Sequence, residues 1–185
     1  MICPWGLEGL VIKVDKFPET GWGLCSLIQV IPEQFPFMLT PYEAYRHNYL
    51  GPGLFHKAPL SSIIKRDVFS KINGFKELRM VGDFEMWHRL ALLFTVVLMP
   101  DGIVWYRKHA EQEMSSYRKY IPVYEKLKFQ FLNDKNCPLD KAEIKTVVVN
   151  SRKKALKEIL KGIILLDISR VKDNYLRYSI AGSKS

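Results

Sequence analysis

Two different apolar patterns divide the sequence, and they constrain its fold more than any other feature. Short apolar runs, bounded by proline, glycine and asparagine, fill the first 110 residues, and longer stretches with helical spacing fill the rest. The short runs are typical of buried strands between turns and short helices, whereas the longer spacing is typical of amphipathic helices. We therefore predict a mixed α/β (α+β) fold with a helical C-terminal extension.

The same patterns place the individual elements. We expect helices over residues 4–17, 41–49, 68–72, 83–94, 117–133 and 140–168. We expect strands over residues 23–31, 59–65, 95–99 and 102–107, and irregular backbone over the proline-rich residues 32–41. Asp67 is expected to cap the helix that follows it, and Asn73-Gly74 is expected to end that helix.

The charge is distributed unevenly and suggests two regions. Residues 1–117 carry 12 Lys/Arg and 12 Asp/Glu, whereas residues 118–185 carry 16 Lys/Arg and 7 Asp/Glu. We therefore predict a neutral domain over residues 1–117 and a basic helical extension over residues 118–185. A basic tail on a neutral body is informative about partners rather than about fold.

The extension contains a basic amphipathic helix. Three lysines lie on one face and five aliphatic residues on another: Lys153, Lys157 and Lys161, and Leu156, Ile159, Leu160, Ile163 and Ile164. Such a helix can lie on an anionic membrane surface. Alternatively, it packs on the domain or on a second copy in a homodimer, with its lysines in water.

The sequence also narrows the compartment. The first residues have neither the basic start nor the apolar core of a secretory signal, and the longest apolar run, residues 90–99, is half of a membrane span. The three cysteines are far apart and form no metal-binding pair. We expect a soluble protein of the cytoplasm, or of the inner face of the membrane.

Neither of the common phosphate-binding loops, GxGxxG and GxxxxGK, occurs in the sequence, and no DxD pair precedes Asp83. We therefore expect any nucleotide to be bound by residues outside this chain. A nucleic-acid-binding module is the rival class, given the high isoelectric point. It is disfavoured because the positive charge is confined to the tail and no recognition motif accompanies it.

Three blocks of sequence carry the functional signal. They are APLSSIIKRDVFSKINGF (residues 58–75), GDFEMWHRLA (residues 82–91) and VVLMPDGIVWYRKHAEQEMS (residues 96–115). In this order they resemble the second half of family 2 glycosyltransferases of the GT-A fold, over about residues 5–120. The matching positions are Ser61, Ser62, Lys65, Arg66, Phe69, Gly74, Phe75, Asp83, Glu85, Trp87, Arg89, Tyr106, Arg107, His109 and Ser115.

The resemblance implies an inverting transfer of a sugar from a nucleotide-sugar donor to a saccharide or lipid-linked acceptor, as in polysaccharide synthesis at the cell envelope. It implies a divalent metal, Mn²⁺ or Mg²⁺, in the intact enzyme. No cofactor is expected in this chain, because the nucleotide-binding half with its DxD motif is missing from it. We expect the chain alone to be inactive. A non-catalytic interaction module is the alternative.

Asp83 is the implied general base, since an acceptor hydroxyl is a poor nucleophile unless a carboxylate takes its proton. At the start of a helix, the carboxylate would meet backbone N–H groups and the positive end of the helix dipole, which favour its ionised form. A simple N-cap is the alternative. The family usually has an acidic residue immediately before this Asp, where this sequence has Gly82.

Five residues are implied to contact the acceptor: Ser61, Ser62, Glu85, Trp87 and Arg89. The residues themselves allow other interpretations. Trp87 lies on the apolar stripe of its helix and suits the core, and Glu85 and Arg89 are spaced for an ion pair.

On the donor side, Arg107 and His109 are implied to reach the diphosphate, and His109 is also a weak candidate for a metal ligand.

Overall fold

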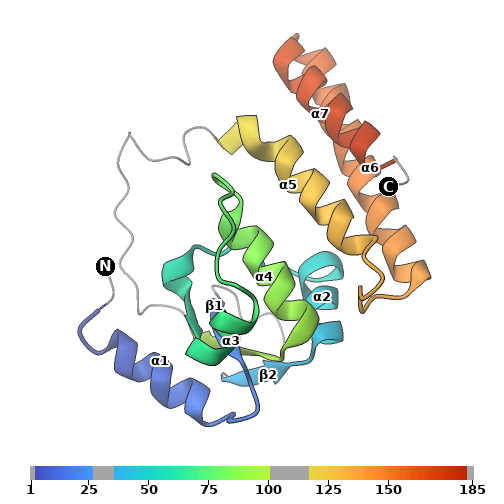
Figure 1. Ribbon diagram of the computed structural model, residues 1–185. Coiled ribbons are helices and arrows are strands. Elements are labelled where there is room, and N and C mark those ends of the chain that lie inside the picture. The colour runs from blue at the N-terminus through green and yellow to red at the C-terminus, as the bar shows by residue number, and fades with distance from the viewer. Residues whose placement is uncertain (1–2, 27–35, 101–116, 183–185) are drawn as a thin grey trace. The chain divides into compact units, whose positions relative to one another are not determined.

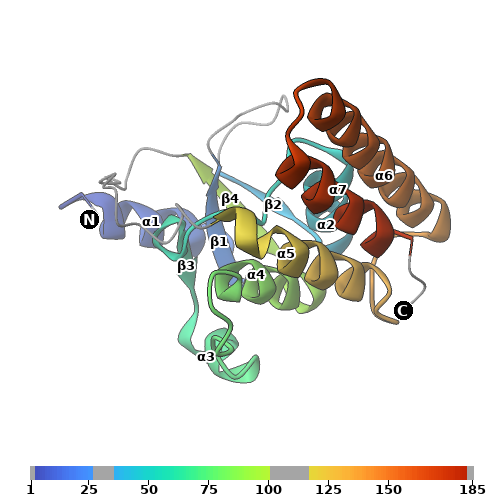
Figure 2. The same ribbon diagram turned by 90° about the horizontal axis from the view of Figure 1, so that it is seen from above.

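The computed structural model describes residues 3–26, 36–100 and 117–182, and these form two compact units, Met1–Gln112 and Glu113–Ser185. Figure 1 shows the strands confined to the first unit, and Figure 2 gives a second view of the same elements. The first unit combines a four-stranded sheet with helices, and the second is helical in its described part. The predicted mixed α+β class is confirmed.

The sheet has the strand order β2-β4-β1-β3. Its strands are β1 (Trp22–Ser26), β2 (Phe37–Leu39), β3 (Ser62–Ile64) and β4 (Val96–Pro100). The two central strands, β1 and β4, run parallel, with Trp22 opposite Val96, and each edge strand pairs antiparallel with its neighbour. A parallel pair needs a crossover, and here the chain between residues 26 and 96 provides it.

Two of these strands differ from the prediction. β2 lies within residues 32–41, which were predicted to be irregular. It is possible there because Phe37, Met38 and Leu39 follow the last internal proline, Pro36, and keep their N–H groups for pairing with β4. β3 is shorter than predicted, because a 3-10 turn, Pro59–Ser61, precedes it. Residues 27–31 and the strand expected over 102–107 lie outside the described residues.

Alternation along the central strands gives the sheet two apolar faces. Leu10 and Val14 of helix α1 (Gly6–Asp15) pack with Cys25 of β1 and with Val97 and Met99 of β4. The intervening side chains face the other way, and there Trp22 stacks on Trp87 of helix α4 (Gly82–Leu93), with ring centroids 5.5 Å apart. α1 and α4 therefore cover opposite faces of the sheet (Figures 1 and 2).

Helix α2 (Pro41–Leu50) packs beside α4 and begins at a complete capping box. The Thr40 hydroxyl accepts the N–H of Glu43, and the Glu43 carboxylate accepts the N–H of Thr40 at 2.8 Å. Pro41 occupies the first helical position, as predicted, and Gly51 ends the helix.

Helix α3 (Arg66–Lys71) is short and ends where the sequence indicated. Asn73 adopts a left-handed conformation, with φ of 56°, and the N–H of Gly74 donates to the carbonyl of Phe69 at 3.0 Å, as in a Schellman motif. The predicted cap is wrong: Lys65 is the N-cap, and Asp67 lies inside the first turn, where it forms an exposed pair with Lys71.

The second unit contains helices α5 (Tyr117–Leu132), α6 (Lys141–Ile164) and α7 (Ile168–Ile180). α5 agrees with the prediction. The single helix predicted over 140–168 is wrong at its C-terminal end: α6 stops at Ile164, and α7 continues to Ile180 as a separate helix packed along α6. Residues 165–167, where the chain leaves the helix, contain no glycine or proline, although Gly162 lies in the last turn of α6. Leu166, with φ of 52°, takes the left-handed position that glycine usually fills.

Candidate functional site

The first turn of α4 holds Asp83, the residue on which the functional prediction rests. Gly82 is the first helical residue and Val81 is the N-cap, so Asp83 lies one position inside the helix. Asp83 therefore does not cap the helix, and the alternative interpretation as a simple N-cap is wrong. Its Oδ1 accepts the N–H of the neighbouring residue Phe84 at 2.8 Å. Immediately before this turn, Met80 has a φ of 67°, a left-handed conformation that is uncommon for such a residue.

The surroundings of Asp83 raise the pKa of its carboxyl, whereas its place at the start of a helix was expected to favour the ionised form. Partial burial raises the pKa of the Asp83 carboxyl, and the backbone N–H of Phe84 opposes this by favouring the ionised form. Burial has the larger effect, so the expected stabilisation of the charge at a helix start is outweighed. A carboxylate with a raised pKa takes up a proton more readily, which suits a general base.

Glu85 and Arg89, by contrast, are joined to each other and to the scaffold. Arg89 Nε donates to both carboxylate oxygens of Glu85, at 2.8 and 2.9 Å, and Lys76 Nζ lies 2.7 Å from the same carboxylate, whose side chain is only 1% exposed. The guanidinium also donates to the carbonyls of Ile72 and Gly74. These contacts tie α4 to the end of α3 and fit the ion-pair interpretation, so neither residue is kept in the candidate site.

Trp87 is a core residue. Its ring is fully buried and lies almost parallel to that of Trp22, and its Nε1 donates to the carbonyl of Lys57 at 2.8 Å. A sugar ring needs an exposed aromatic face on which to stack, and Trp87 offers none. The core interpretation therefore fits better than a role in acceptor binding.

The two predicted serines lie on the edge of the sheet. Ser61 ends the 3-10 turn, and Ser62, the first residue of β3, donates its hydroxyl to the carbonyl of Pro59 at 2.7 Å. In the described part of the chain, no hydrogen bond joins either serine to Asp83. Arg107 and His109 lie within residues 101–116, which are outside the described residues.

A histidine of the loop before β3, His56, packs on the residue that follows Asp83. The exposed ring of His56 packs on the ring of Phe84, with centroids 4.8 Å apart. Because Phe84 immediately follows Asp83, the loop before β3 borders the first turn of α4. The sequence offered no spacing signal for this contact, since 27 residues separate the two positions.

Beneath this site lies a buried polar network that was also missed. His88 is fully buried, with Nδ1 2.6 Å from the carbonyl of Phe84 and Nε2 2.5 Å from the hydroxyl of Tyr49 on α2. Burial lowers the pKa of His88 to about 3, so the ring is neutral. Since a carbonyl can only accept, Nδ1 carries the proton, and Nε2 accepts the hydrogen bond from Tyr49.

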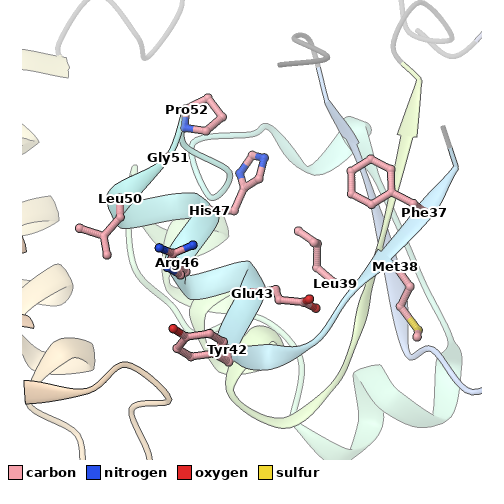
Figure 3. Close-up of a pocket in the computed structure, with 10 residues that line it drawn as sticks. All are labelled: Phe37, Met38, Leu39, Tyr42, Glu43, Arg46, His47, Leu50, Gly51 and Pro52. Atoms are coloured by element: carbon pink, nitrogen blue, oxygen red, sulfur yellow. The ribbon is translucent and has the colours of Figure 1, made fainter. Parts of the chain in front are cut away.

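A separate hollow of about 580 Å³ lies between α2 and β2. Figure 3 shows Phe37 of β2 and His47 of α2 facing this space from its two sides. Burial lowers the pKa of His47, and its Nδ1 is buried without a hydrogen-bond partner among the described residues. None of the predicted site residues lines this hollow.

The described residues contain neither a cluster of metal-ligating side chains nor a helix that could cross a membrane. No group of three or more His, Cys, Asp or Glu side chains in them is arranged to hold a metal ion. No helix among them combines the length and the apolar character that crossing a membrane requires.

A scan against models of known protein families finds no match for this chain, and a search of curated proteins finds none either.

Proposed function

We propose that this chain is the acceptor-side part of an inverting glycosyltransferase, and that Asp83 is its general base. The observation that carries the proposal is the contrast between two carboxylates of one helix turn. Glu85 is buried and held by two cationic side chains, whereas the carboxyl of Asp83 is partly exposed, has only backbone hydrogen-bond partners among the described residues, and has a raised pKa. Asp83 is thus the carboxylate of this turn that can accept a proton from a substrate.

In the proposed reaction, an acceptor hydroxyl attacks the anomeric carbon of a nucleotide sugar. A bond forms between the hydroxyl oxygen and that carbon, the carbon–phosphate oxygen bond breaks on the opposite side, and the hydroxyl proton passes to Asp83. The acceptor is a saccharide or a lipid-linked saccharide. His56 packs on Phe84, the residue after the base, and is proposed to contact the acceptor in place of Glu85, Trp87 and Arg89.

The leaving diphosphate needs positive charge, which a divalent metal supplies when it is bound. Arg107 and His109 remain the candidates for the donor side. The nucleotide is proposed to bind to a part of the full-length protein that resembles the first half of the family.

The test is sugar transfer, or hydrolysis of the nucleotide sugar, by the full-length protein and its Asp83→Asn variant. We expect a loss of at least about 100-fold in kcat, the usual scale for removing a general base. Asp67→Asn, which removes an exposed carboxylate from the first turn of α3, is the matched control and should keep full activity. Full activity of Asp83→Asn would refute the base assignment. Measurable nucleotide-sugar binding by this chain alone would refute the proposed division into halves.

A non-catalytic interaction module is the alternative, and one observation favours it. Helix α1 and its N-cap expose three large apolar side chains, Trp5, Leu7 and Ile12, which are available to a partner. This alternative predicts that Leu7→Ser/Ile12→Ser abolishes a protein association, whereas Asp83→Asn leaves every function intact.

A further inference from the structure

The turn between α6 and α7 ends in an exposed cluster of aliphatic side chains, which we call the hairpin tip. Its five residues are Ile163, Ile164, Leu165, Leu166 and Ile168. All are more than half exposed, and the most exposed are Leu166 at 87% and Ile164 at 79%. Isolated exposed aliphatic residues are ordinary, but a contiguous group of this kind usually marks a binding surface.

The backbone of the tip is shaped so that these side chains point outward. The N–H of Asp167 donates to the carbonyl of Gly162 at 2.8 Å, which closes the end of α6, and Leu166 takes the left-handed conformation within this turn. Glycine fills that position at low cost, whereas a leucine there is strained. The sequence thus places its most exposed aliphatic side chain where a glycine would be more stable, and strain of this kind is typical of functional sites.

Lysines flank the tip. On the side of α6 away from α7, the row Lys153, Lys157 and Lys161 runs next to the aliphatic row Leu156, Leu160 and Ile164, and all six are exposed. The other side of α6 packs closely on α7, since a Cβ on Gly162 would lie 2.8 Å from Val171. The exposed surface of α6 is therefore half aliphatic and half cationic.

The acidic side chains near the tip do not cancel this charge. The Glu158 carboxylate pairs with Lys161 at 2.9 Å and with Arg170 at 3.3 Å. Asp167 caps α7 by accepting the N–H of Arg170 at 2.9 Å. Lys153 and Lys157 have no ion-pair partner among residues 3–26, 36–100 and 117–182. The surface around the tip thus keeps an excess of positive charge.

We propose that the hairpin tip inserts into the headgroup region of an anionic membrane, with the lysine row of α6 on the lipid phosphates. Aliphatic side chains gain from entering the acyl boundary, and each nearby lysine gains from the negative surface potential. A second copy of the chain fits less well, because residues 118–185 carry nine more basic than acidic residues, and two such surfaces repel each other. The proposal does not depend on sugar transfer.

The test measures how the whole chain partitions onto vesicles in a flotation assay. The vesicles contain either phosphatidylcholine alone or phosphatidylcholine with 40% phosphatidylglycerol. We expect binding to the anionic vesicles, weak binding to the neutral ones, and a decrease as salt is raised from about 0.05 to 0.5 M, since salt screens the attraction.

Two variants and two matched controls locate the contact. Leu165→Ser/Leu166→Gly should reduce the partition constant at least about tenfold without lowering the melting temperature, because glycine relieves the strained position. Lys153→Glu/Lys157→Glu should reduce it at least about 25-fold, since each lysine near the surface contributes roughly fivefold. As matched controls, Leu7→Ser/Ile12→Ser on α1 and Lys141→Glu/Lys145→Glu at the far end of α6 should bind like the unchanged protein.

Three results would overturn the proposal. The first is an absence of binding to the anionic vesicles by the unchanged chain. The second is an equal loss of binding in the tip variants and their controls. The third is a concentration-dependent dimer, measured by analytical ultracentrifugation, that the tip variants abolish while lipid binding persists. This last result would identify a second copy as the partner of the tip.

Discussion

The hydroxyl of Tyr49 lies 2.5 Å from Nε2 of the fully buried His88, so one hydrogen bond ties α2 to α4, and its direction follows from the proton that the carbonyl of Phe84 holds on Nδ1. The folded protein binds a proton at His88 only near pH 3, whereas an unfolded histidine binds one near pH 6.5. The unfolded state therefore binds more protons between these values, and stability falls as the pH falls.

We expect His88 to contribute a slope of about 1.4 kcal/mol per pH unit to the free energy of unfolding between pH 6 and 4, and a total loss on the order of 5 kcal/mol by pH 3. Urea unfolding at several pH values measures this slope. The slope should be smaller by that amount in His88→Gln, whereas His56→Gln should keep most of it, because burial is the largest cause of the low pKa of His88 and the charge on His56 only adds to it. An identical slope in His88→Gln would contradict the assignment.

Tyr49→Phe is expected to lower the stability at pH 7.5 by about 1–3 kcal/mol, because it leaves the buried Nε2 of His88 without a donor. Denaturant titration measures the change. Tyr42→Phe, on the exposed side of α2, is the control and should change the stability by less than about 0.5 kcal/mol.

Asp83→Asn is expected to stabilise the fold at neutral pH. Burial raises the pKa of Asp83, so the folded state disfavours its ionised form. This cost in stability is absent once the pH falls below the pKa that the Asp83 carboxyl has in the unfolded chain. An uncharged amide avoids the cost at pH 7. The melting temperature should therefore rise while sugar transfer by the full-length protein is lost. A clear fall in the melting temperature would indicate that Asp83 is structural.

Glu85→Ala should be strongly destabilising, by about 3–5 kcal/mol, because it leaves the partly buried Arg89 without its carboxylate and loosens the contact between α4 and the end of α3. Glu77→Ala, in the exposed loop before α4, is the matched control and should have little effect. Equal stability of the two variants would show that Glu85 does not stabilise the fold.

Gly162 and Gly9 should respond in opposite ways to alanine. A Cβ at Gly162 would lie 2.8 Å from Val171 Cγ2 and 3.2 Å from the carbonyl of Asp167, so Gly162→Ala should cost about 1–3 kcal/mol and expose the amides of α7 to hydrogen exchange. A Cβ at Gly9 meets only Lys13 Nζ, at 3.4 Å, so Gly9→Ala should stabilise α1 by about 0.5–1 kcal/mol. If the amides of α7 stay protected from hydrogen exchange in Gly162→Ala, the two helices can shift far enough to accommodate the added methyl group.

Local signals in the sequence predicted α1, α2 and α5 well, since each has regular apolar spacing and two have clear boundary residues. The break between α6 and α7 was missed because Gly162 precedes it within the apolar pattern, and a leucine instead of a glycine adopts the left-handed conformation at the turn. β2 was missed because prolines before a strand look the same in sequence as prolines within an irregular segment.

The site was harder to predict than the fold. Asp83 was placed within one residue of the helix start, but its raised pKa depends on tertiary burial, which no local pattern encodes. His56 and Tyr49 reach the same helix from sequence-distant positions, and only the packed structure brings them there.

The parallel pairing of β1 with β4 has a consequence for synthesis. Trp22 and Val96, which lie opposite each other, are more than seventy residues apart in the chain. At typical rates of translation, β1 is made roughly 4–15 s before its central partner exists. During that interval Trp22, Leu24 and Cys25 have at most the edge strand β3 beside them, so we expect nascent chains arrested before residue 96 to depend on chaperones, and those extended past β4 to become resistant to protease.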